Sequence, residues 1–248
     1  AVCGRTPERL DAARATLEPY GRRVLTVQAD VRDHESVARM FEYLESELGP
    51  VTTLVNNAAG NFYSASEDLS PGGFKAVIDI VLHGTFNCSH TFGNRAIANK
   101  RPGVILNIVT SYTETGSAFV LPSACAKAGD YALTTTLAYE WAEYGFRVNA
   151  IAPGPFPTPG AWKRLVPNQE FEDQYRLRQP FKRFGEPHEL AAAATFLISD
   201  AASYINGECL HVDGGERLSG GQLNFLTQLL PRDSLKGLFR KMRAARSE

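Results

Sequence analysis

The strongest constraint on the fold is the way short apolar runs alternate with segments of helical periodicity. Runs typical of strands occur at 24–28, 51–56, 103–109, 146–152 and 208–212. Segments typical of helices occur at 34–48, 71–98, 122–143 and 189–198. The run 103–109 is apolar at nearly every position, as in a parallel strand covered on both faces. Strands joined by helices of this length predict an α/β fold, a doubly wound parallel sheet of the Rossmann type in a single domain.

The composition of the chain excludes several classes of function. With 248 residues, 44% of them hydrophobic, the chain is long enough to bury a large core. A formal net charge of −1 provides no field that attracts nucleic acid, so we expect no such partner. No apolar run reaches the roughly 18 residues that a membrane span needs. Residues 1–10 lack the pattern of a signal peptide, which predicts a cytoplasmic protein if the source is bacterial and leaves organelle targeting open.

The four cysteines are widely spaced and form no CxxC pair. They are Cys3, Cys88, Cys125 and Cys209. This spacing favours buried free thiols in a reducing compartment over a disulfide or a metal site. We therefore expect no metal cofactor.

The beginning of the chain lacks a part that nucleotide-binding sheets of this type contain. Residues 1–5 (AVCGR) resemble the end of a strand, and no GxGxxG motif lies near them. In such sheets a first strand and a Gly-rich turn place pyrophosphate at a helix N-terminus. We therefore expect a strand-turn-helix unit of about 30 to 35 residues to precede Ala1. A fold that never contained this unit is the alternative.

Five short motifs follow one another in a fixed order. They are Asp30-Val31, the segment 56–60 (NNAAG), Lys127 within 124–129 (ACAKAG), the segment 147–154 (RVNAIAPG) and Asp213-Gly214-Gly215. Each alone is weak, but together, at these spacings, they resemble the short-chain dehydrogenase/reductase family. The resemblance covers a domain from residue 1 to about 215 and implies a nicotinamide-dependent oxidoreductase. Residues 216–248 form a tail outside it, which we expect to be helical from about Asp233.

The end of the first strand predicts the cofactor. NAD-preferring members of the family usually carry an Asp there, which hydrogen-bonds the ribose hydroxyls. This chain has Gly4 followed by Arg5, and a guanidinium can bind a 2′-phosphate that a carboxylate would repel. NADP(H) is therefore the expected cofactor. The resemblance implies further cofactor contacts from Asp30, Val31, Asn57, Ala58, Gly60, Lys127, Pro153, Gly154, Pro155 and Phe156. Arg5 as a surface charge and Asp30 as a turn residue are the alternatives.

One position departs from the usual catalytic pattern of the family. Most members carry Tyr-x-x-x-Lys, whereas this chain reads Ser123-x-x-x-Lys127. A Ser hydroxyl is far less acidic than a phenol, so either another group donates or the protein is inactive. Tyr112 lies 15 residues before Lys127, just after the apolar run 103–109. This shifted Tyr, together with Ser123 and Lys127, resembles the mitochondrial-type 2,4-dienoyl-CoA reductases.

The closer resemblance implies a reaction and a role for each residue. Tyr112 and Asn61 would donate to the thioester oxygen of an acyl-CoA, as in an oxyanion hole, and Lys127 would hold the nicotinamide ribose. The acyl-CoA site is expected at Asn61, Phe62, Ser70, Tyr112 and Arg164. The expected reaction is the NADPH-dependent reduction of a 2,4-dienoyl-CoA to a trans-3-enoyl-CoA in fatty-acid β-oxidation.

Two alternatives to this function stay open. The first is another short-chain reductase that acts on an enoyl-CoA, a 3-oxoacyl thioester or a carbonyl. The second is an inactive nucleotide-binding or interaction protein. Plain structural roles are also open for Tyr112 as a strand-end aromatic, Asn61 as a turn cap, Ser123 as a helix-start residue and Arg164 as a surface charge.

His83 is a second departure from the family pattern. Most members carry an Asn at this position, which supports a water chain to the Lys. Because a histidine can both donate and accept, we hypothesise that His83 keeps this relay role; a packed polar substitute without function is the alternative. The resemblance further implies a homo-oligomer, commonly a tetramer.

Overall fold

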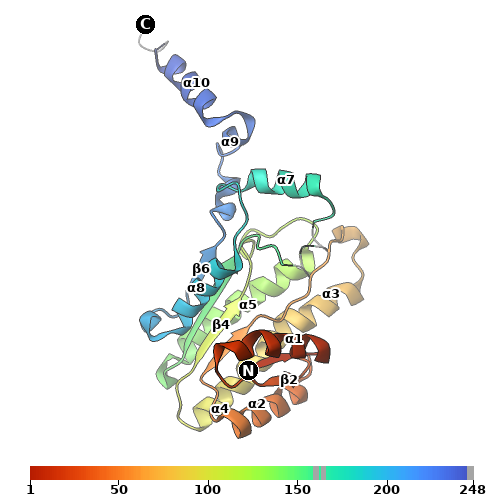
Figure 1. Cartoon of the computed structure of the whole chain (residues 1–248). Helices are drawn as coiled ribbons and strands as arrows, with labels where there is room; N and C mark the ends of the chain where they lie inside the picture. The colour runs from red at the N-terminus through yellow and green to blue at the C-terminus, as the bar shows by residue number, and fades with distance from the viewer. Residues whose placement is uncertain (159–161, 163–165, 245–248) are drawn as a thin grey trace. The chain divides into compact units, whose positions relative to one another are not determined.

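Helices and strands alternate along the chain in the computed structural model, which describes residues 1–158, 162 and 166–244 (Figure 1). The strands are β1 (Val2–Gly4), β2 (Thr26–Gln28), β3 (Thr53–Asn56), β4 (Val104–Ile108), β5 (Arg147–Pro153) and β6 (Cys209–Val212). The helices are α1 (Pro7–Leu17), α2 (His34–Leu48), α3 (Pro71–Ile78), α4 (Gly84–Ala98), α5 (Leu121–Glu140), α7 (Gln169–Arg178), α8 (Pro187–Ile198), α9 (Leu226–Leu229) and α10 (Arg232–Ala244). All five predicted strands are confirmed, with ends shifted by a few residues.

The strands form two groups. β1 pairs with β2 in parallel, with Val2 opposite Thr26. The other strands follow the order β3-β4-β5-β6, and β3 and β5 both run parallel to β4. The α/β class with parallel strands is therefore confirmed. Within the residues that the structure describes, β1 and β3 each pair with a single strand, so the expected unit before Ala1 stays a prediction.

The chain divides into two compact units. The first comprises Ala1–Ala152 and Ala191–His211, and the second comprises Pro153–Leu190 and Val212–Glu248. The first unit carries most of the strands and the main hydrophobic core. The domain boundary predicted near residue 215 stays a prediction.

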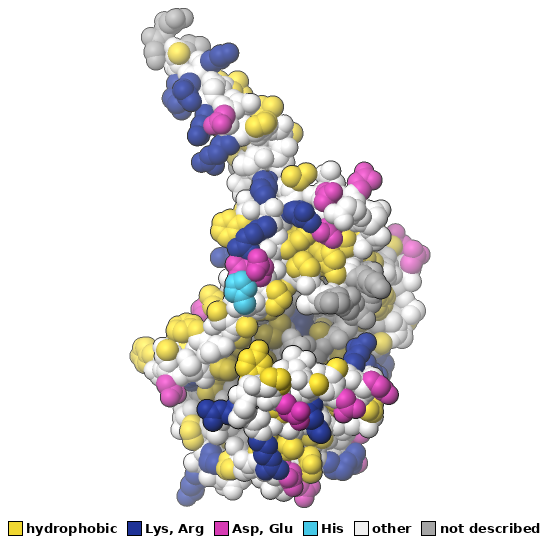
Figure 2. Space-filling model, viewed as in Figure 1, with side chains coloured by type: hydrophobic (Ala, Val, Ile, Leu, Met, Phe, Trp, Pro, Cys, Tyr) yellow, Lys and Arg dark blue, Asp and Glu magenta, His cyan; other side chains and the backbone are white. Residues whose placement is uncertain are grey.

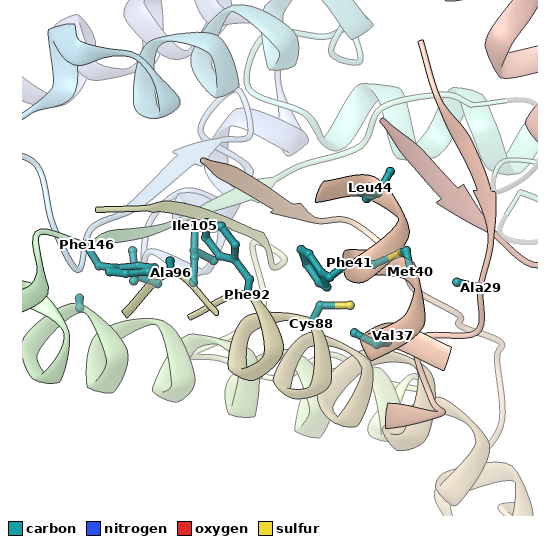
Figure 3. Packing of buried hydrophobic residues seen from close by; sticks show 12 residues of the cluster. Ala29, Val37, Met40, Phe41, Leu44, Cys88, Phe92, Ala96, Ile105 and Phe146 are labelled. Carbon is teal, nitrogen blue, oxygen red and sulfur yellow. The ribbon is translucent and has the colours of Figure 1, made fainter. Parts of the chain in front are cut away.

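The main core of the first unit lies where α2 and α4 meet (Figure 3). Apolar residues of α2 recur at helical spacing, and Val37, Met40, Phe41 and Leu44 are all buried. Figure 3 shows the Phe41 side chain pointing toward Phe92 of α4, and their ring centroids lie 6.1 Å apart. Asp33 starts α2, because its side chain accepts a hydrogen bond from the Glu35 amide. The predicted helix 34–48 is confirmed.

The predicted helix 71–98 is not one continuous α-helix. α3 and α4 are separated by a π-helical turn at Asp79–His83, where the Gly84 amide donates to the Asp79 carbonyl. Val77 and Val81 pack against Ala126 of α5. Cys88 and Phe92, farther along, belong to the core that α4 shares with α2. The apolar pattern predicted one helix because it does not reveal a single inserted residue.

Several other features of the chain differ from expectation or are new. α1 and α7 have no counterpart among the predicted segments. Of the cysteines expected to be buried, Cys88 is buried, whereas Cys3 and Cys125 are exposed. Over the described part of the chain, no helix is both long and apolar enough to cross a membrane.

Candidate functional site

The segment between β4 and α5 brings Tyr112 to the start of α5. The Tyr112 hydroxyl lies 3.1 Å from the Ser123 hydroxyl, so the two form a hydrogen bond. Ser123 is 4% exposed in the first turn of α5, where the preceding Pro122 needs no hydrogen-bond partner for its nitrogen. A phenol therefore reaches the helix position at which the sequence carries Ser in place of Tyr.

Lys127 lies one helical turn beyond Ser123, on the same face of α5. Its side chain is 5% exposed, and Nζ lies 3.0 Å from Oδ2 of Asp130, which is 1% exposed. The ammonium group also donates to the Ile108 carbonyl at the end of β4. Burial raises the pKa of Asp130, while the Lys127 ammonium and the Thr85 hydroxyl oppose that rise. Asp130 was not among the sequence-predicted residues, although an acid three residues after the Lys is a usable signal.

A buried polar network fixes the backbone around this pair. The side-chain amide of Asn56 donates to the Ser89 hydroxyl at 2.9 Å and to the side-chain oxygen of Asn107 at 2.8 Å. Asn107 donates to Thr134 at 2.8 Å, and Thr134 donates to the Asp130 carbonyl at 2.7 Å. These bonds join β3, β4, α4 and α5 at the point where the candidate catalytic residues lie, which restricts their movement.

The loop after β3 carries Asn61 and a tyrosine that sequence reasoning missed. Asn61 Oδ1 accepts a hydrogen bond from the backbone amide of the next residue, Phe62, at 2.9 Å. The Ser64 amide donates to the Phe119 carbonyl, so this loop is joined to the segment that carries Tyr112. Burial raises the pKa of Tyr63, and the neighbouring Tyr112 hydroxyl raises it further. Tyr63 therefore lies close to Tyr112.

The residues predicted for acyl-CoA binding are only partly described. Ser70 starts α3, since its hydroxyl accepts from the Gly73 amide at 3.0 Å. The exposed Phe62 ring lies over the same turn, because a Cβ on Gly73 would be 3.2 Å from it. Arg164 lies outside the described residues.

The C-terminal ends of β1 and β2 carry a cluster of charges. Arg32 Nη2 lies 2.5 Å from Asp30 Oδ2, and this guanidinium holds the pKa of Asp30 below its ordinary value. Arg5, which follows β1, also lowers that pKa and so lies near the same carboxylate. Val31 packs behind them, where its carbonyl accepts from Asn87 of α4. Two guanidinium groups lie near the Asp30 carboxylate here, and Asp79 also acts on Arg32. Arg32, a second Arg just after a strand, was missed.

His83 lies beside an acid, Asp79. Its Nδ1 is 3.1 Å from Asp79 Oδ1, and Lys75 Nζ is 2.5 Å from the other oxygen of Asp79. The pKa of Asp79 is lowered by the hydrogen bond from Lys75 and, to a lesser degree, by His83. The imidazole of His83 is 58% exposed. The relay role of His83 stays a prediction.

The remaining cofactor candidates lie in two loops. Asn57 and Ala58 are exposed after β3, and Gly60 is half-buried against Ile80. Pro153, Gly154, Pro155 and Phe156 begin the second unit. The Gly154 amide donates to Val212, and a Cβ on Gly154 would lie 2.8 Å from the Asp213 backbone, so glycine is required by this close approach. Phe156 packs on Gly185 in the same unit.

Two curated relatives cover most of the chain. A "Probable 2,4-dienoyl-CoA reductase [(2E)-enoyl-CoA-producing]" of Bacillus subtilis is 43% identical over 219 residues, which are 88% of this chain and 86% of the relative. A probable (3E)-enoyl-CoA-producing 2,4-dienoyl-CoA reductase of Caenorhabditis elegans is 39% identical over 87% of this chain and 71% of its own length.

Solved structures share the fold over a similar length. A short chain dehydrogenase from Bacillus anthracis is 42% identical with a TM-score of 0.79, covering 87% of this chain and 85% of the other. A gluconate 5-dehydrogenase from Burkholderia cenocepacia, solved in complex with NADP and tartrate, is 30% identical with a TM-score of 0.81, covering 87% and 84%. The family model described as Enoyl-(Acyl carrier protein) reductase matches residues 1–216. The chain therefore belongs to the short-chain dehydrogenase/reductase family of Rossmann-type oxidoreductases.

Proposed function

We propose that the protein reduces a 2,4-dienoyl-CoA with NADPH. The observation that carries this proposal is the 3.1 Å contact between the Tyr112 and Ser123 hydroxyls. An ordinary member of the family places its phenol on the helix itself, whereas here the phenol comes from the preceding loop. The relatives named as 2,4-dienoyl-CoA reductases support the same substrate class.

The residues of this chain fit NADPH better than NADH. Gly4 provides no carboxylate at the end of β1, and Arg5 and Arg32 supply two guanidinium groups of the kind that binds a 2′-phosphate. Lys127 would hold the nicotinamide ribose, and residues 153–156 would contact the nicotinamide half. The NADP complex of a 30% identical relative supports this cofactor. When bound, NADPH would supply a hydride to C5 of the conjugated acyl chain.

The chain's own contribution is to stabilise the charge that develops on the thioester oxygen. Tyr112 and Asn61 would donate hydrogen bonds to that oxygen, and preorganised donors of this kind are worth most in a buried site. Ser123 would hold the Tyr112 hydroxyl in place through the bond already present. The buried network that ends at Thr134 keeps α5 from shifting while charge develops.

The site of protonation decides the product. Protonation at C2 gives a 3-enoyl-CoA, and protonation at C4 gives a 2-enoyl-CoA. The two relatives differ on this point by name, since one is described as (2E)- and the other as (3E)-enoyl-CoA-producing. We propose the trans-3-enoyl product, because donors held at the thioester oxygen bring the proton source next to C2.

The remaining roles complete the proposed reaction. Phe62, Ser70 and Arg164 would bind the acyl-CoA, and His83 would keep the relay role by supporting a water chain to Lys127. The proposed setting is fatty-acid β-oxidation, with the protein as a homotetramer. Its compartment is cytoplasmic if the source is bacterial.

The test is to follow NADPH oxidation with a 2,4-dienoyl-CoA, a 2-enoyl-CoA, a 3-oxoacyl-CoA and gluconate as separate substrates. We expect turnover of the dienoyl thioester alone, with product position determined by NMR. Tyr112→Phe should lower kcat by about 10²- to 10³-fold, the usual loss for one oxyanion donor. Tyr139→Phe, at an 89% exposed position, is the matched control and should leave kcat unchanged.

Other results would redirect the proposal. Turnover of a 3-oxoacyl-CoA or of gluconate, with Tyr112→Phe unaffected, would move both the substrate and the donor elsewhere. No turnover of any substrate, with NADPH bound normally, would favour an inactive nucleotide-binding protein.

A further inference from the structure

The ion pair between Lys127 and Asp130 is buried on both sides. The two side chains are 5% and 1% exposed, and Nζ and Oδ2 lie 3.0 Å apart. Removing two charges from water costs several kilocalories per mole for each ion, and the attraction between them repays this only when the geometry is good. Because such a pair adds little net stability, its presence beside the candidate site calls for another reason.

The ammonium group of Lys127 is held by two acceptors. One is Asp130 Oδ2 and the other is the Ile108 carbonyl. An ammonium has three N–H donors, so these two bonds fix the direction of the third. Without Asp130, the Nζ atom would rotate about its long flexible stem and this direction would be lost.

The backbone of Asp130 is fixed by a hydrogen bond of its own. Its carbonyl accepts from Thr134, which is bonded in turn to Asn107 of β4. Its second carboxylate oxygen, Oδ1, is buried, and the neighbouring Thr85 hydroxyl stabilises the ionised carboxylate.

We propose that Asp130 is a positioning residue that holds the Lys127 ammonium directed for the cofactor, an inference that rests on the proposed use of NADPH by this site. Asp130 acts through Lys127 and touches neither cofactor nor substrate. A purely structural pair would instead support the fold and leave cofactor affinity unaffected once folding is accounted for.

A double-mutant cycle tests this in binary complexes with NADPH, without acyl-CoA. The variants are Asp130→Asn, Lys127→Met and both together, and Kd is measured from nicotinamide fluorescence. Asp130→Asn should raise the Kd of NADPH about tenfold or more in the parent, the effect of losing one hydrogen bond to a charged group. In the Lys127→Met background it should change Kd less than about twofold, because its target is gone. Asp233→Asn, which removes the acid of an exposed Lys–Asp pair with the same spacing, should leave Kd unchanged.

Equal effects of Asp130→Asn in the two backgrounds, or no effect in the parent, would overturn the proposal. If Asp130→Asn alone fails to fold, the Lys127→Met and double variants still decide, since neither contains the buried ammonium. The Asp130 carboxyl that Lys127→Met leaves behind can take up a proton, because burial raises its pKa. A further loss of NADPH affinity on adding Asp130→Asn to Lys127→Met would then contradict it. Failure of the dienoyl-CoA assay with this cycle intact would reject the substrate and leave the positioning role standing.

Discussion

At the scale of single residues, Gly93 shows how tightly the first unit is packed. A Cβ at Gly93 would lie 2.3 Å from Cη2 of Trp141, well inside van der Waals contact. The indole cannot move away easily, because it packs edge-on against the Phe146 ring, with the two ring centroids 5.3 Å apart. The Phe146 ring packs in turn against Phe92. The missing methyl group of one glycine therefore allows a chain of three aromatic rings to pack.

We expect Gly93→Ala to destabilise the protein. Alanine gains about 1 kcal/mol of helix propensity, but overpacking against the indole costs roughly 1–3 kcal/mol, so the clash should prevail. Urea denaturation measures the difference. Gly72→Ala in α3, where a Cβ meets nothing within 4 Å, is the control and should be neutral or slightly stabilising. A Gly93→Ala protein as stable as its parent would mean that the aromatic chain repacks freely.

Residue chemistry predicted part of the candidate site and missed the rest. Tyr112, Ser123 and Lys127 were found from the shifted motif, and the structure brings Tyr112 to Ser123. Asp130 and Tyr63 were missed because an isolated acid or phenol reveals its partner only once the chain is folded. Arg32 was missed for the same reason, since its pairing with Asp30 depends on the turn between them.

At the scale of elements, one carboxylate links α2 to the end of α4. Glu45 of α2 accepts from Arg95 at 2.7 Å and from Arg101 at 3.2 Å. Burial of Glu45 opposes its ionisation, but the two guanidinium groups outweigh this and lower its pKa. The link therefore holds two helices of the core together only while Glu45 is ionised.

Glu45→Gln should weaken the fold in a pH-dependent way. At pH 7 we expect a loss of roughly 1.5–3 kcal/mol in the free energy of unfolding, the range for hydrogen bonds to charged groups. Because the folded pKa of Glu45 is lowered, its contribution is complete above the ordinary Glu range and is lost as pH falls through the folded pKa. Chemical denaturation between pH 7 and pH 3 should show the two proteins converging. Glu47→Gln, in an exposed pair on the same helix, should show almost no difference at any pH.

The helices that could be predicted are those with an apolar face and a clear start. α2 has both, in its buried stripe and in the Asp33 cap, and its predicted bounds match. α1 was missed because it buries a single residue, Leu10, and so has almost no periodicity to read. α7 buries none of its residues and therefore also lacks an apolar periodicity. The starts of both helices nevertheless carry local signals, since Pro7 begins α1 and the Asn168 side chain accepts from the Phe171 backbone amide at the start of α7.

At the scale of the whole chain, charge is divided unevenly along the sequence. Residues 216–248 hold seven Lys and Arg against three Asp and Glu, although the whole chain has a net charge of −1. Figure 2 shows basic and hydrophobic side chains side by side along α10. Leu238, Phe239 and Met242 are 45%, 38% and 50% exposed on one face of that helix. Among residues 216–244, which the structure describes, Leu235 alone is buried.

Deleting residues 222–248 should therefore leave the fold of the first unit intact. We expect Tm to change by no more than about 2–4 °C, which corresponds to roughly 1 kcal/mol in a chain of this size. Circular dichroism should show the loss of α9 and α10 and an otherwise unchanged cooperative transition. A fall in Tm of more than about 10 °C would mean that the tail is part of the cooperative structure, and gel filtration would then show whether it acts between subunits.

The π-helical turn at Asp79–His83 has a consequence for how this chain can change in evolution. In an unbroken α-helix, Val77, Val81, Cys88 and Phe92 would form a single stripe within about 60° of arc, at 100° per residue. The extra residue in the turn swings the second half by roughly 100°, so Val77 and Val81 pack on α5 while Cys88 and Phe92 pack on α2. A one-residue deletion there would look like a small gap in an alignment of sequences. Because the turn accommodates one extra residue, such a deletion would restore a regular α-helix and leave Cys88 and Phe92 facing α2. The length of this segment can therefore change by one residue without altering the packing on either side of it.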